Sequence, residues 1–477
     1  MAYERLELLI DGQFRQGSQG VTQEVVNPAT EEVLGALPHA SADDLDEALA
    51  ASERGFDAWR SMTPLARQKV MEDAARLLEA RSDAIAETLT REMGKPLGEA
   101  KMELGFTIDV LRWYAEEGKR AYGRIVPSRV PGMRALVTSE PVGPVAAFVA
   151  WNFPGVNVIR KIAGALGAGC SIILKACEET PGTAIAIARA LQEAGLPDGT
   201  LNLVFGEPAA VSEHLLASRI PRKLSFTGSV SVGKHLQKLA AETLKRCTME
   251  LGGHAPVLVF DDVDIEKTAK AAAQGKFRNA GQVCVSPTRF LVQQDRYEAF
   301  ADAFVEAARE VKVGNGLDEG VTMGPLVGER RLGVMQEFVD DAKSHGGQVM
   351  LGGARRGNQG WFYEPTVIKD VPDTAMIMNE EPFGPIAPIA PFRDLDEALE
   401  KANRLEFGLA SYAFTHDPKR IRRLENEIDA GLVGINSFVI STPETPFGGV
   451  NESGYGSEGG IEGLDAYLRT KFVTETV

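Results

Sequence analysis

The hydrophobic positions of the first quarter of the chain repeat at helical spacing. Ser41 is followed three residues later by Asp44, the arrangement of a capping box, and Leu45, Leu49 and Trp59 then fall on one helix face. A threonine directly before a proline opens a second helix a few residues later. These patterns predict a mostly helical beginning of the chain.

An alternating pattern replaces the helical one between residues 122 and 141. Residues 134–138 are predicted to form an exposed strand that has few partners nearby in the sequence. Because an unpaired strand edge tends to associate with another strand, we expect this hairpin to pair with another subunit or with the C-terminal strand at residues 470–476.

From residue 142 onward, short apolar runs alternate with helical runs. Repeated strand–helix units of this size predict an α/β protein with a parallel sheet and helices on both faces of the sheet. A second series of the same kind starts at residues 257–260 and continues to about residue 433. The strands expected in the first series are residues 145–151, 171–175, 201–205 and 223–226.

Length, charge and cysteine content narrow the class of protein. A chain of 477 residues exceeds what one hydrophobic core usually supports, so two or three domains are expected. The net charge of −16, with no dense cluster of lysine and arginine, argues against nucleic acid as a partner. Four widely spaced cysteines form no metal or redox motif and are typical of a reduced cytosol. With no signal-like N-terminus and no apolar run of about 18 residues, we expect a cytoplasmic protein without membrane contact and without a bound metal.

The candidate nucleophile is Cys284, which ends the run GQVC that begins at Gly281. An alanine-rich helical run at residues 264–275 precedes it, and a strand-like run at residues 288–292 follows it. A reactive thiolate needs an accessible sulfur near oriented N–H groups. A lone cysteine is more often a small buried apolar residue, so this stretch alone leaves both interpretations open.

A candidate phosphate-binding turn lies at residues 227–234, TGSVSVGK. It follows a predicted strand and opens a helix, and this geometry offers free backbone N–H groups to a phosphate. The run nearly matches the P-loop pattern, but His235 stands where a hydroxyl residue would hold magnesium, which argues against an ATPase. A plain turn between a strand and a helix is the alternative.

Polar side chains also stand at the ends of other predicted strands. The amide of Asn152, in the run WNFP, could donate to a developing oxyanion or could cap a turn. Lys175 and Glu178 flank the end of the next strand, where a surface salt bridge is the simple explanation. Glu250, directly before the run LGG, is either a buried structural carboxylate or a general base with a raised pKa.

Seven such runs, in this order along the chain, resemble the motifs of the aldehyde dehydrogenase superfamily over essentially the whole sequence. They are residues 151–154 (WNFP), Lys175 with Glu178, 226–229 (FTGS), 250–253 (ELGG), 281–284 (GQVC), 381–385 (EPFGP) and 446–449 (PFGG). The resemblance implies the aldehyde dehydrogenase fold, with a Rossmann-like NAD-binding domain, an α/β catalytic domain and a β oligomerisation arm. The implied boundaries are residues 1–120 and 142–251 for the first, 252–440 for the second, and 121–141 with 455–477 for the arm. A homodimer or homotetramer is expected, since the arm cannot complete a sheet alone.

The resemblance also implies roles for the residues at the matching positions. Cys284 would attack the aldehyde, Asn152 and the Cys284 N–H would stabilise the oxyanion, and Glu250 would activate water. Relatives that transfer the acyl group to coenzyme A usually lack this glutamate, so hydrolysis is favoured. The carboxylate of Glu178 should accept from both ribose hydroxyls and repel a 2′-phosphate, so NAD is favoured over NADP. The residues implied to bind the cofactor are Trp151, Lys175, Glu178, Gly228, Ser229, Gly233, Leu251, Glu381 and Phe383.

Within this superfamily the chain is most similar to the succinate-semialdehyde and 2-oxoglutarate-semialdehyde dehydrogenases. Arg160 and Arg278 match two arginines that bind a carboxylate in the first group, and Ser441 matches their third anchor, with Thr442 as the alternative register. A guanidinium can hold a carboxylate through two N–H donors, whereas a surface ion pair is the alternative role of each arginine. The implied substrate-binding residues are Arg160, Arg278, Ser441, Phe153 and Phe447.

We therefore expect oxidation of an aldehyde that carries a distal carboxylate, in the first place succinate semialdehyde. The alternatives are 2-oxoglutarate semialdehyde, whose dehydrogenases have runs similar to residues 285–290 and 453–460, and a broad range of aliphatic aldehydes. Ser286 stands where many succinate-semialdehyde dehydrogenases have a second cysteine, so that redox switch is not expected. A binding protein of the same fold without activity is the remaining class, and the presence of a candidate nucleophile, base and oxyanion donor argues against it.

Overall fold

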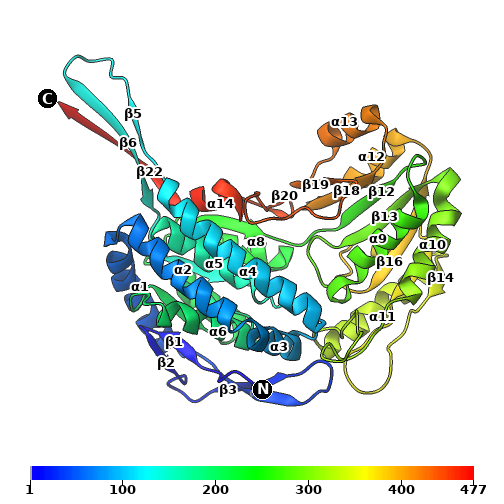
Figure 1. The fold of residues 1–477 in the computed structure, drawn as a ribbon, viewed down its shortest axis with the longest axis horizontal. Coiled ribbons are helices and arrows are strands. Elements are labelled where there is room, and N and C mark those ends of the chain that lie inside the picture. Colours follow the sequence, from blue (N-terminus) through cyan, green and yellow to red (C-terminus); the bar gives the residue numbers. More distant parts are fainter. Residues whose placement is uncertain (1–2, 477) are drawn as a thin grey trace.

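The computed structural model describes residues 3–476, which form two large sheets and a projecting three-stranded arm (Figure 1). The first sheet has the strand order β2-β1-β9-β8-β7-β10-β11-β21, and its five central strands run parallel. Its strands are β1 (Leu8–Ile10), β2 (Gln13–Arg15), β7 (Val145–Phe148), β8 (Ile172–Lys175), β9 (Leu201–Val204), β10 (Lys223–Thr227), β11 (Arg246–Glu250) and β21 (Gly454–Tyr455).

Helices of the first half of the chain pack around this sheet, as the helical spacing predicts. Ser41 Oγ accepts from the Asp44 N–H at 3.1 Å and the Asp44 carboxylate accepts from the Ser41 N–H at 2.9 Å, so the capping box is confirmed. Trp59 is fully buried, and its Nε1 donates to the Leu166 carbonyl at 2.9 Å. The helices are α1 (Ala42–Ser61), α2 (Pro64–Ala80), α3 (Ser82–Met93), α4 (Leu97–Glu117), α5 (Val156–Ala168), α6 (Pro181–Glu193), α7 (Pro208–Ala217) and α8 (Val230–Ala241).

The second sheet has the order β14-β15-β16-β13-β12-β18-β19, and all its neighbouring strands except β14 and β15 pair in parallel. The α/β class predicted from the alternating runs is therefore confirmed. The strands are β12 (Ala255–Val259), β13 (Pro287–Gln293), β14 (Gln348–Leu351), β15 (Thr366–Lys369), β16 (Ile386–Phe392), β18 (Ala410–Phe414) and β19 (Leu432–Ile435). The helices beside them are α9 (Ile265–Phe277), α10 (Tyr297–Arg309), α11 (Glu329–Ser344), α12 (Leu395–Asn403) and α13 (Pro418–Glu427).

The arm consists of the hairpin β5 (Arg124–Val126) and β6 (Met133–Pro141) together with the C-terminal strand β22 (Leu468–Thr476). β22 pairs antiparallel with β6 along its whole length, from Leu468 opposite Pro141 to Thr476 opposite Met133. The expected pairing of the hairpin with the C-terminal strand is thus present within one chain. The arm projects away from both sheets in Figure 1.

Short elements complete the fold. Two further two-stranded sheets join β3 (Thr22–Val26) to β4 (Val33–Pro38), and β17 (Phe407–Gly408) to β20 (Val450–Asn451). One more helix is α14 (Gly460–Asp465), and the 3₁₀ turns are η1 (Gly118–Arg120), η2 (Arg278–Gly281), η3 (Gln294–Arg296) and η4 (Met376–Met378). Within residues 3–476 no helix is both long enough and apolar enough to cross a bilayer.

Two separate apolar clusters lie beneath the two sheets, and the change from one to the other falls between Leu251 and Ala255. The division into domains stays a prediction, but one of its boundaries needs adjustment. Leu464 and Tyr467 belong to the first cluster and β21 pairs with β11, so residues 454–467 pack against the first sheet. In the described part of the expected arm segment 455–477, β22 forms the arm strand, whereas Leu464 and Tyr467 before it are buried in the first cluster.

Candidate active site

The parallel strands of the first sheet place several candidate residues at one edge. Strands β7, β8, β10 and β11 all point their carboxyl ends to this edge, where open α/β sheets bind ligands. The strand predicted to continue to residue 151 ends at Phe148, because residues 149–155 leave the sheet in an irregular loop before α5. That loop brings Asn152 and Phe153 toward the second sheet, where Cys284 lies.

A cavity of about 300 Å³ lies between α4, α5, η2 and the segment after β19. It contains both the candidate nucleophile and the candidate base, as well as the five residues expected to bind the substrate. Its lining is Lys95, Glu99, Met102, Glu103, Phe106, Phe153, Val156, Asn157, Arg160, Glu250, Arg278, Val283, Cys284, Val285, Phe438, Val439, Ile440, Ser441 and Phe447. Its size and its mixture of aromatic and charged walls suit a small molecule with a polar end.

Cys284 lies in the loop between η2 and β13, and it is partly buried. The backbone before it is unusual, since Asn279 and Ala280 both have left-handed φ values of 49° and 52°. Gly281 has a φ of 72°, and a Cβ added there would lie 2.1 Å from the Gly384 carbonyl oxygen. Only glycine allows this approach, so Gly281 fixes the path of the loop that carries the thiol.

Burial raises the pKa of the Cys284 thiol, and the nearby carboxylates of Glu250 and Glu381 raise it further. The positive charge of Arg160 acts in the opposite direction. The resting thiol is therefore protonated at neutral pH, and it needs a base to become a nucleophile.

Glu250 ends β11 and faces the same cavity. Its side chain is buried, and its Oε1 has no hydrogen-bond partner among the residues that the structure describes. Burial raises the pKa of Glu250 to about 8, with a further contribution from the charge of Glu458, while Arg160 and Lys161 oppose the shift. The burial and the raised pKa are compatible with both interpretations of this carboxylate, and its role as a base stays a prediction.

Asn152 holds the segment before Cys284. Its side-chain nitrogen donates to the Gln282 carbonyl at 3.2 Å, and its side-chain oxygen accepts from Asn157 at 3.1 Å. The cavity wall includes Asn157 but not Asn152. In this structure the Asn152 amide, which is expected to bind an oxyanion, therefore donates to the carbonyl of Gln282, two residues before Cys284.

The two arginines of the cavity are free of carboxylate partners. Arg160 is buried, donates to Ser441 Oγ at 2.7 Å and stacks on the Phe447 ring, 4.1 Å from its centroid. Arg278 is exposed and lies 5.3 Å from the centroid of the Phe153 ring. Neither guanidinium forms an ion pair within residues 3–476. The surface ion pairs considered from the sequence are thus not observed, and Arg160 Nε lacks any hydrogen-bond partner in the described part of the chain.

The turn after β8 holds Lys175 and Glu178 in a buried contact. Lys175 Nζ lies 2.6 Å from Glu178 Oε2, and Glu178 Oε1 accepts from the Gly206 N–H at 3.0 Å. Both side chains are buried, so the expected salt bridge is present but does not lie at the open surface. Together with the bond to Gly206, it joins the carboxyl ends of β8 and β9.

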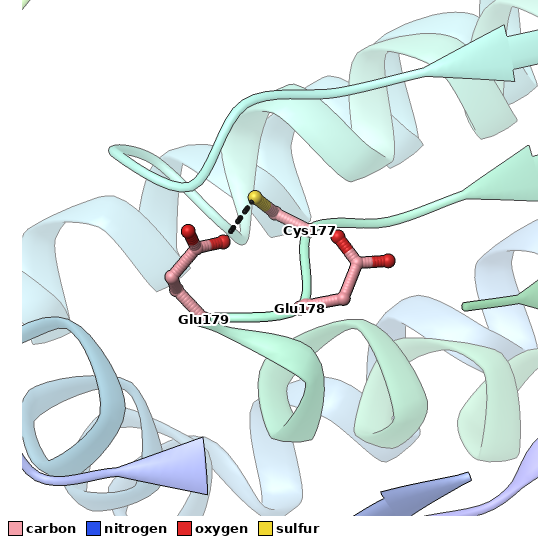
Figure 2. Close-up of side chains that lie close together, drawn as sticks. All are labelled: Cys177, Glu178 and Glu179. Carbon is pink, nitrogen blue, oxygen red and sulfur yellow. Dashed lines mark hydrogen bonds between the residues drawn. The ribbon is translucent and has the colours of Figure 1, made fainter. Parts of the chain in front are cut away.

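Two neighbours extend this group, as Figure 2 shows. Cys177 Sγ donates to Glu179 Oε2 at 2.8 Å, while Glu178 points away from Glu179. The three side chains could bring a sulfur and two carboxylates within reach of a cation. Because Glu178 is already occupied by Lys175 and Gly206, and because burial raises the pKa of the Cys177 thiol, the group is poorly prepared to bind a metal.

The strand-to-helix turn at β10 leaves helix α8 without a side-chain cap. Ser229 occupies the N-cap position but accepts no hydrogen bond there, so N–H groups of the first helical turn remain available. Gly228 donates to the Glu250 carbonyl at 3.0 Å, which ties the turn to the end of β11. A Cβ at Gly233 would lie 2.5 Å from the Leu251 side chain, so glycine is needed for this contact.

Glu381 lies on the second sheet's side of the groove. Its Oε1 accepts from the Gly253 N–H at 3.3 Å, and burial raises its pKa to about 8. Phe383 has a left-handed φ of 44° and packs edge-on against Trp151, with 5.5 Å between the ring centroids. The contacts Phe383–Trp151 and Glu381–Gly253 therefore join cofactor candidates from the two halves of the chain.

Sequence reasoning missed two buried ion pairs of the site. Lys95 binds Glu103 below the Phe153 ring, and Lys161 binds Glu458 beside Glu250. Lys95 and Glu458 lie in loops and carry no periodic signal. Glu103 in α4 and Lys161 in α5 stand at buried helix positions, and such residues are rarely fully buried unless paired, so they are the signal that could have indicated the two pairs.

Comparisons with known proteins identify the relatives of this architecture. The model of the aldehyde dehydrogenase family matches residues 14–473. A 4-(hydroxymethyl)benzenesulfonate dehydrogenase of Comamonas testosteroni is 46% identical over 471 residues, which cover 99% of this chain and 98% of the relative. An NADP-dependent succinate-semialdehyde dehydrogenase of Escherichia coli is 40% identical and covers 98% of this chain and 97% of the relative. The crystal structure of a succinate-semialdehyde dehydrogenase from Burkholderia pseudomallei matches with a TM-score of 0.98 at 40% identity, covering 99% and 98% of the two chains.

The raised pKa of Glu250 predicts how stability depends on pH. A carboxyl group with a pKa of about 8 when folded and 4.5 when unfolded contributes stability that is fully present below pH 4.5 and is lost as the pH rises to about 8. In Glu250→Gln the side chain cannot ionise, so this loss of stability with rising pH does not occur. Relative to the wild type, the variant should gain on the order of 1–3 kcal/mol of unfolding free energy between pH 5 and pH 8.

The measurement is the urea midpoint of both proteins at the two pH values. Glu425→Gln, which neutralises an exposed carboxylate on α13, is the matched control and should differ from wild type equally at both. A Glu250→Gln difference that does not change with pH would show that this carboxyl titrates normally.

Proposed function

Since this chain belongs to the aldehyde dehydrogenase family, we propose that it oxidises an aldehyde with a distal anionic group to the carboxylic acid. The observation that carries the proposal is the guanidinium of Arg160, which is buried in the same cavity as Cys284 and has no carboxylate partner in the described chain. A buried cation without an anion is costly. An anionic substrate end would supply the missing partner.

The first step joins the substrate to the protein. The Cys284 thiol loses its proton to solvent, the thiolate attacks the aldehyde carbon, and the carbonyl electron pair moves to the oxygen. The resulting thiohemiacetal oxyanion would be held by the Cys284 N–H and the Asn152 amide. Asn152 would exchange its bond to the Gln282 carbonyl for the bond to the oxyanion.

We propose that the cofactor is a dinucleotide bound along the carboxyl ends of the first sheet's strands. The uncapped start of α8 offers N–H groups to a pyrophosphate, and Lys175 and Glu178 stand where the adenosine ribose would lie. Glu381 and Phe383 would hold the nicotinamide half of the molecule. When bound, NAD or NADP supplies the acceptor for the hydride of the thiohemiacetal carbon. The carboxylate of Glu178 favours NAD, because it accepts from hydroxyl groups and repels a 2′-phosphate.

The second step releases the acid. Glu250 takes a proton from a water molecule, the hydroxide attacks the thioester carbonyl, and the Cys284 thiolate leaves as the carboxylic acid forms. A pKa of about 8 suits this role, since the group is a stronger base than an ordinary carboxylate. Its free Oε1 leaves room for the water.

Substitution of the two residues should separate the two steps. Cys284→Ala should lower turnover to less than about one hundredth of wild type while NAD binding persists. Glu250→Gln should instead release one equivalent of NADH and then accumulate a thioester, visible by mass spectrometry of the intact protein. Full turnover in Cys284→Ala, or loss of turnover in Glu250→Gln without any adduct, would contradict the assigned roles.

Succinate semialdehyde is the substrate that we propose first, because Arg160 is joined to Ser441 in the way expected of a carboxylate clamp. A second candidate is an aldehyde with an aromatic sulfonate. It is supported by the 46% identity to the benzenesulfonate relative and by the aromatic cavity walls at Phe106, Phe153 and Phe438. In both cases the two arginines would bind the anionic group of the substrate, and the aromatic side chains would pack on the carbon atoms between that group and the aldehyde.

Matched aldehydes test the substrate class. Succinate semialdehyde should exceed butanal in kcat/KM, and 4-sulfobenzaldehyde should be compared with benzaldehyde in the same way. Loss of one charge-assisted hydrogen bond lowers kcat/KM about 10–100-fold. Arg278→Ala should therefore reduce the ratio of kcat/KM for the anionic aldehyde to kcat/KM for its neutral partner by that factor. Arg219→Ala, at an exposed arginine outside the cavity, should leave the ratio unchanged. Equal rates for each pair would contradict the anion clamp.

We also propose that the arm mediates self-association. Ile125 and Phe472 are 72% and 61% exposed on the arm, and both outer strands of its sheet have an open edge. Phe472→Asp should lower the mass measured by light scattering at micromolar concentration. Leu65→Asp is the control, since Leu65 is 68% exposed on α2 and lies outside the arm. A wild-type monomer would contradict this role of the arm.

A further inference from the structure

The cavity contains one carboxylate that the proposed reaction does not use. The Glu103 carboxylate forms an ion pair with Lys95 and accepts from the N–H groups of Gly155 and Val156 at the start of α5, and Glu250 is the proposed base. Glu99, in the first turn of α4, is half-buried and also lines the cavity. Its Oε2 accepts from the Asn279 N–H at 2.9 Å, which leaves its other oxygen without a hydrogen bond in the described chain.

This hydrogen bond places Glu99 next to Arg278. Asn279 directly follows Arg278 in η2, and the side chains of Glu99 and Arg278 line the same cavity. When Glu99 is ionised, it therefore places a negative charge in the same cavity as Arg278.

The charges around Glu99 come from three elements. Lys95 faces it from the loop before α4, Glu103 from α4 itself, and Arg278 from η2. Burial raises the pKa of Glu99 to about 7, and the charge of Glu103 adds to this, while Lys95 and Arg278 oppose it. Lys95 is already neutralised by Glu103, so Arg278 is the cation whose charge Glu99 can still compensate.

We propose that Glu99 is a specificity-determining residue that competes with the anionic end of the substrate for Arg278. The inference rests on the proposed function of the cavity. When ionised, Glu99 neutralises Arg278 and repels the incoming anion. When protonated, it leaves the guanidinium to the substrate, so binding of the anion and uptake of a proton by Glu99 favour each other.

The consequence is a preference that depends on pH. As the pH rises from 6 to 8.5, Glu99 ionises and anionic aldehydes bind more weakly. Neutral aldehydes of the same length carry no charge, so the ionisation of Glu99 does not weaken their binding. Arg160 is joined to Ser441 and does not depend on Glu99, so part of the preference should remain at high pH.

The test compares succinate semialdehyde with butanal in wild type and in Glu99→Gln between pH 6 and pH 8.5. The ratio of their kcat/KM values cancels any general effect on catalysis. In wild type this ratio should fall about 10-fold over the range, mainly through the KM of the acid. In Glu99→Gln the fall should be clearly smaller, because Glu250 remains as a carboxylate that titrates in the cavity, and at pH 8.5 the ratio should be higher than in wild type. The glutamine side-chain oxygen can still accept from Asn279, so the η2 turn keeps its anchor.

Two further variants sharpen the result. Asp109→Asn removes an exposed carboxylate from the same helix α4 and should keep the wild-type slope. Arg278→Gln should lower the ratio and also make its slope shallower, because the competition with Glu99 needs the guanidinium. This second route tests the proposal even if Glu99→Gln does not fold.

The outcomes separate this inference from the function on which it rests. A preference for the acid that is independent of pH in wild type, or a slope as steep in Glu99→Gln as in wild type, overturns the role of Glu99 and leaves the anion clamp intact. No preference for the acid at any pH overturns the clamp itself, and the competition for Arg278 with it.

Discussion

The buried ion pair of Lys95 and Glu103 joins the parts of the molecule from which the cavity is built. Lys95 Nζ also donates to the Asn152 carbonyl at 2.9 Å and lies 3.9 Å from the centroid of the Phe153 ring. The second oxygen of Glu103 accepts from the Gly155 N–H at 2.8 Å, at the start of α5. Removing one partner of such a pair leaves an uncompensated charge, which typically costs about 3–5 kcal/mol. The loop that carries Asn152 therefore depends on two charges from the other side of the cavity.

The same connection continues into the second sheet. The Asn279 side chain donates to the Asn152 carbonyl and to the Gln282 carbonyl, both at 3.1 Å. The Asn152 amide donates to that Gln282 carbonyl in turn. The segment before Cys284 is thus held by hydrogen bonds to the first half of the chain, and the position of the thiol is set by contacts across the boundary between the two apolar clusters.

Much of this arrangement could be predicted from the sequence, because it follows local rules. The capping box at Ser41, the apolar strands and the glycine before Cys284 all act within a few residues, and the structure has each of them. The buried partners could not be predicted, since Lys95 contacts residues far away in the sequence and its own run reads as a helix stop. Arg160 was predicted as a candidate, but only the folded chain shows that no carboxylate in the described residues pairs with it. The end of β7 at Phe148 was missed because a loop rich in apolar residues looks like a strand.

An overall charge of −16 and a cavity for an anion are compatible, because charges act over different distances. Exposed carboxylates are screened beyond a Debye length of about 8–10 Å at physiological salt. They slow the approach of an anion more than they weaken its binding. Inside the cavity the balance is set by a few groups that salt hardly screens: Arg160 without a carboxylate, Arg278 beside Glu99, and Glu250 beside the thiol. On the proposed function, the protonation of Glu99 and Glu250, whose pKa values burial raises to about 7 and about 8, adjusts the charge of the cavity and with it the preference for an anionic aldehyde.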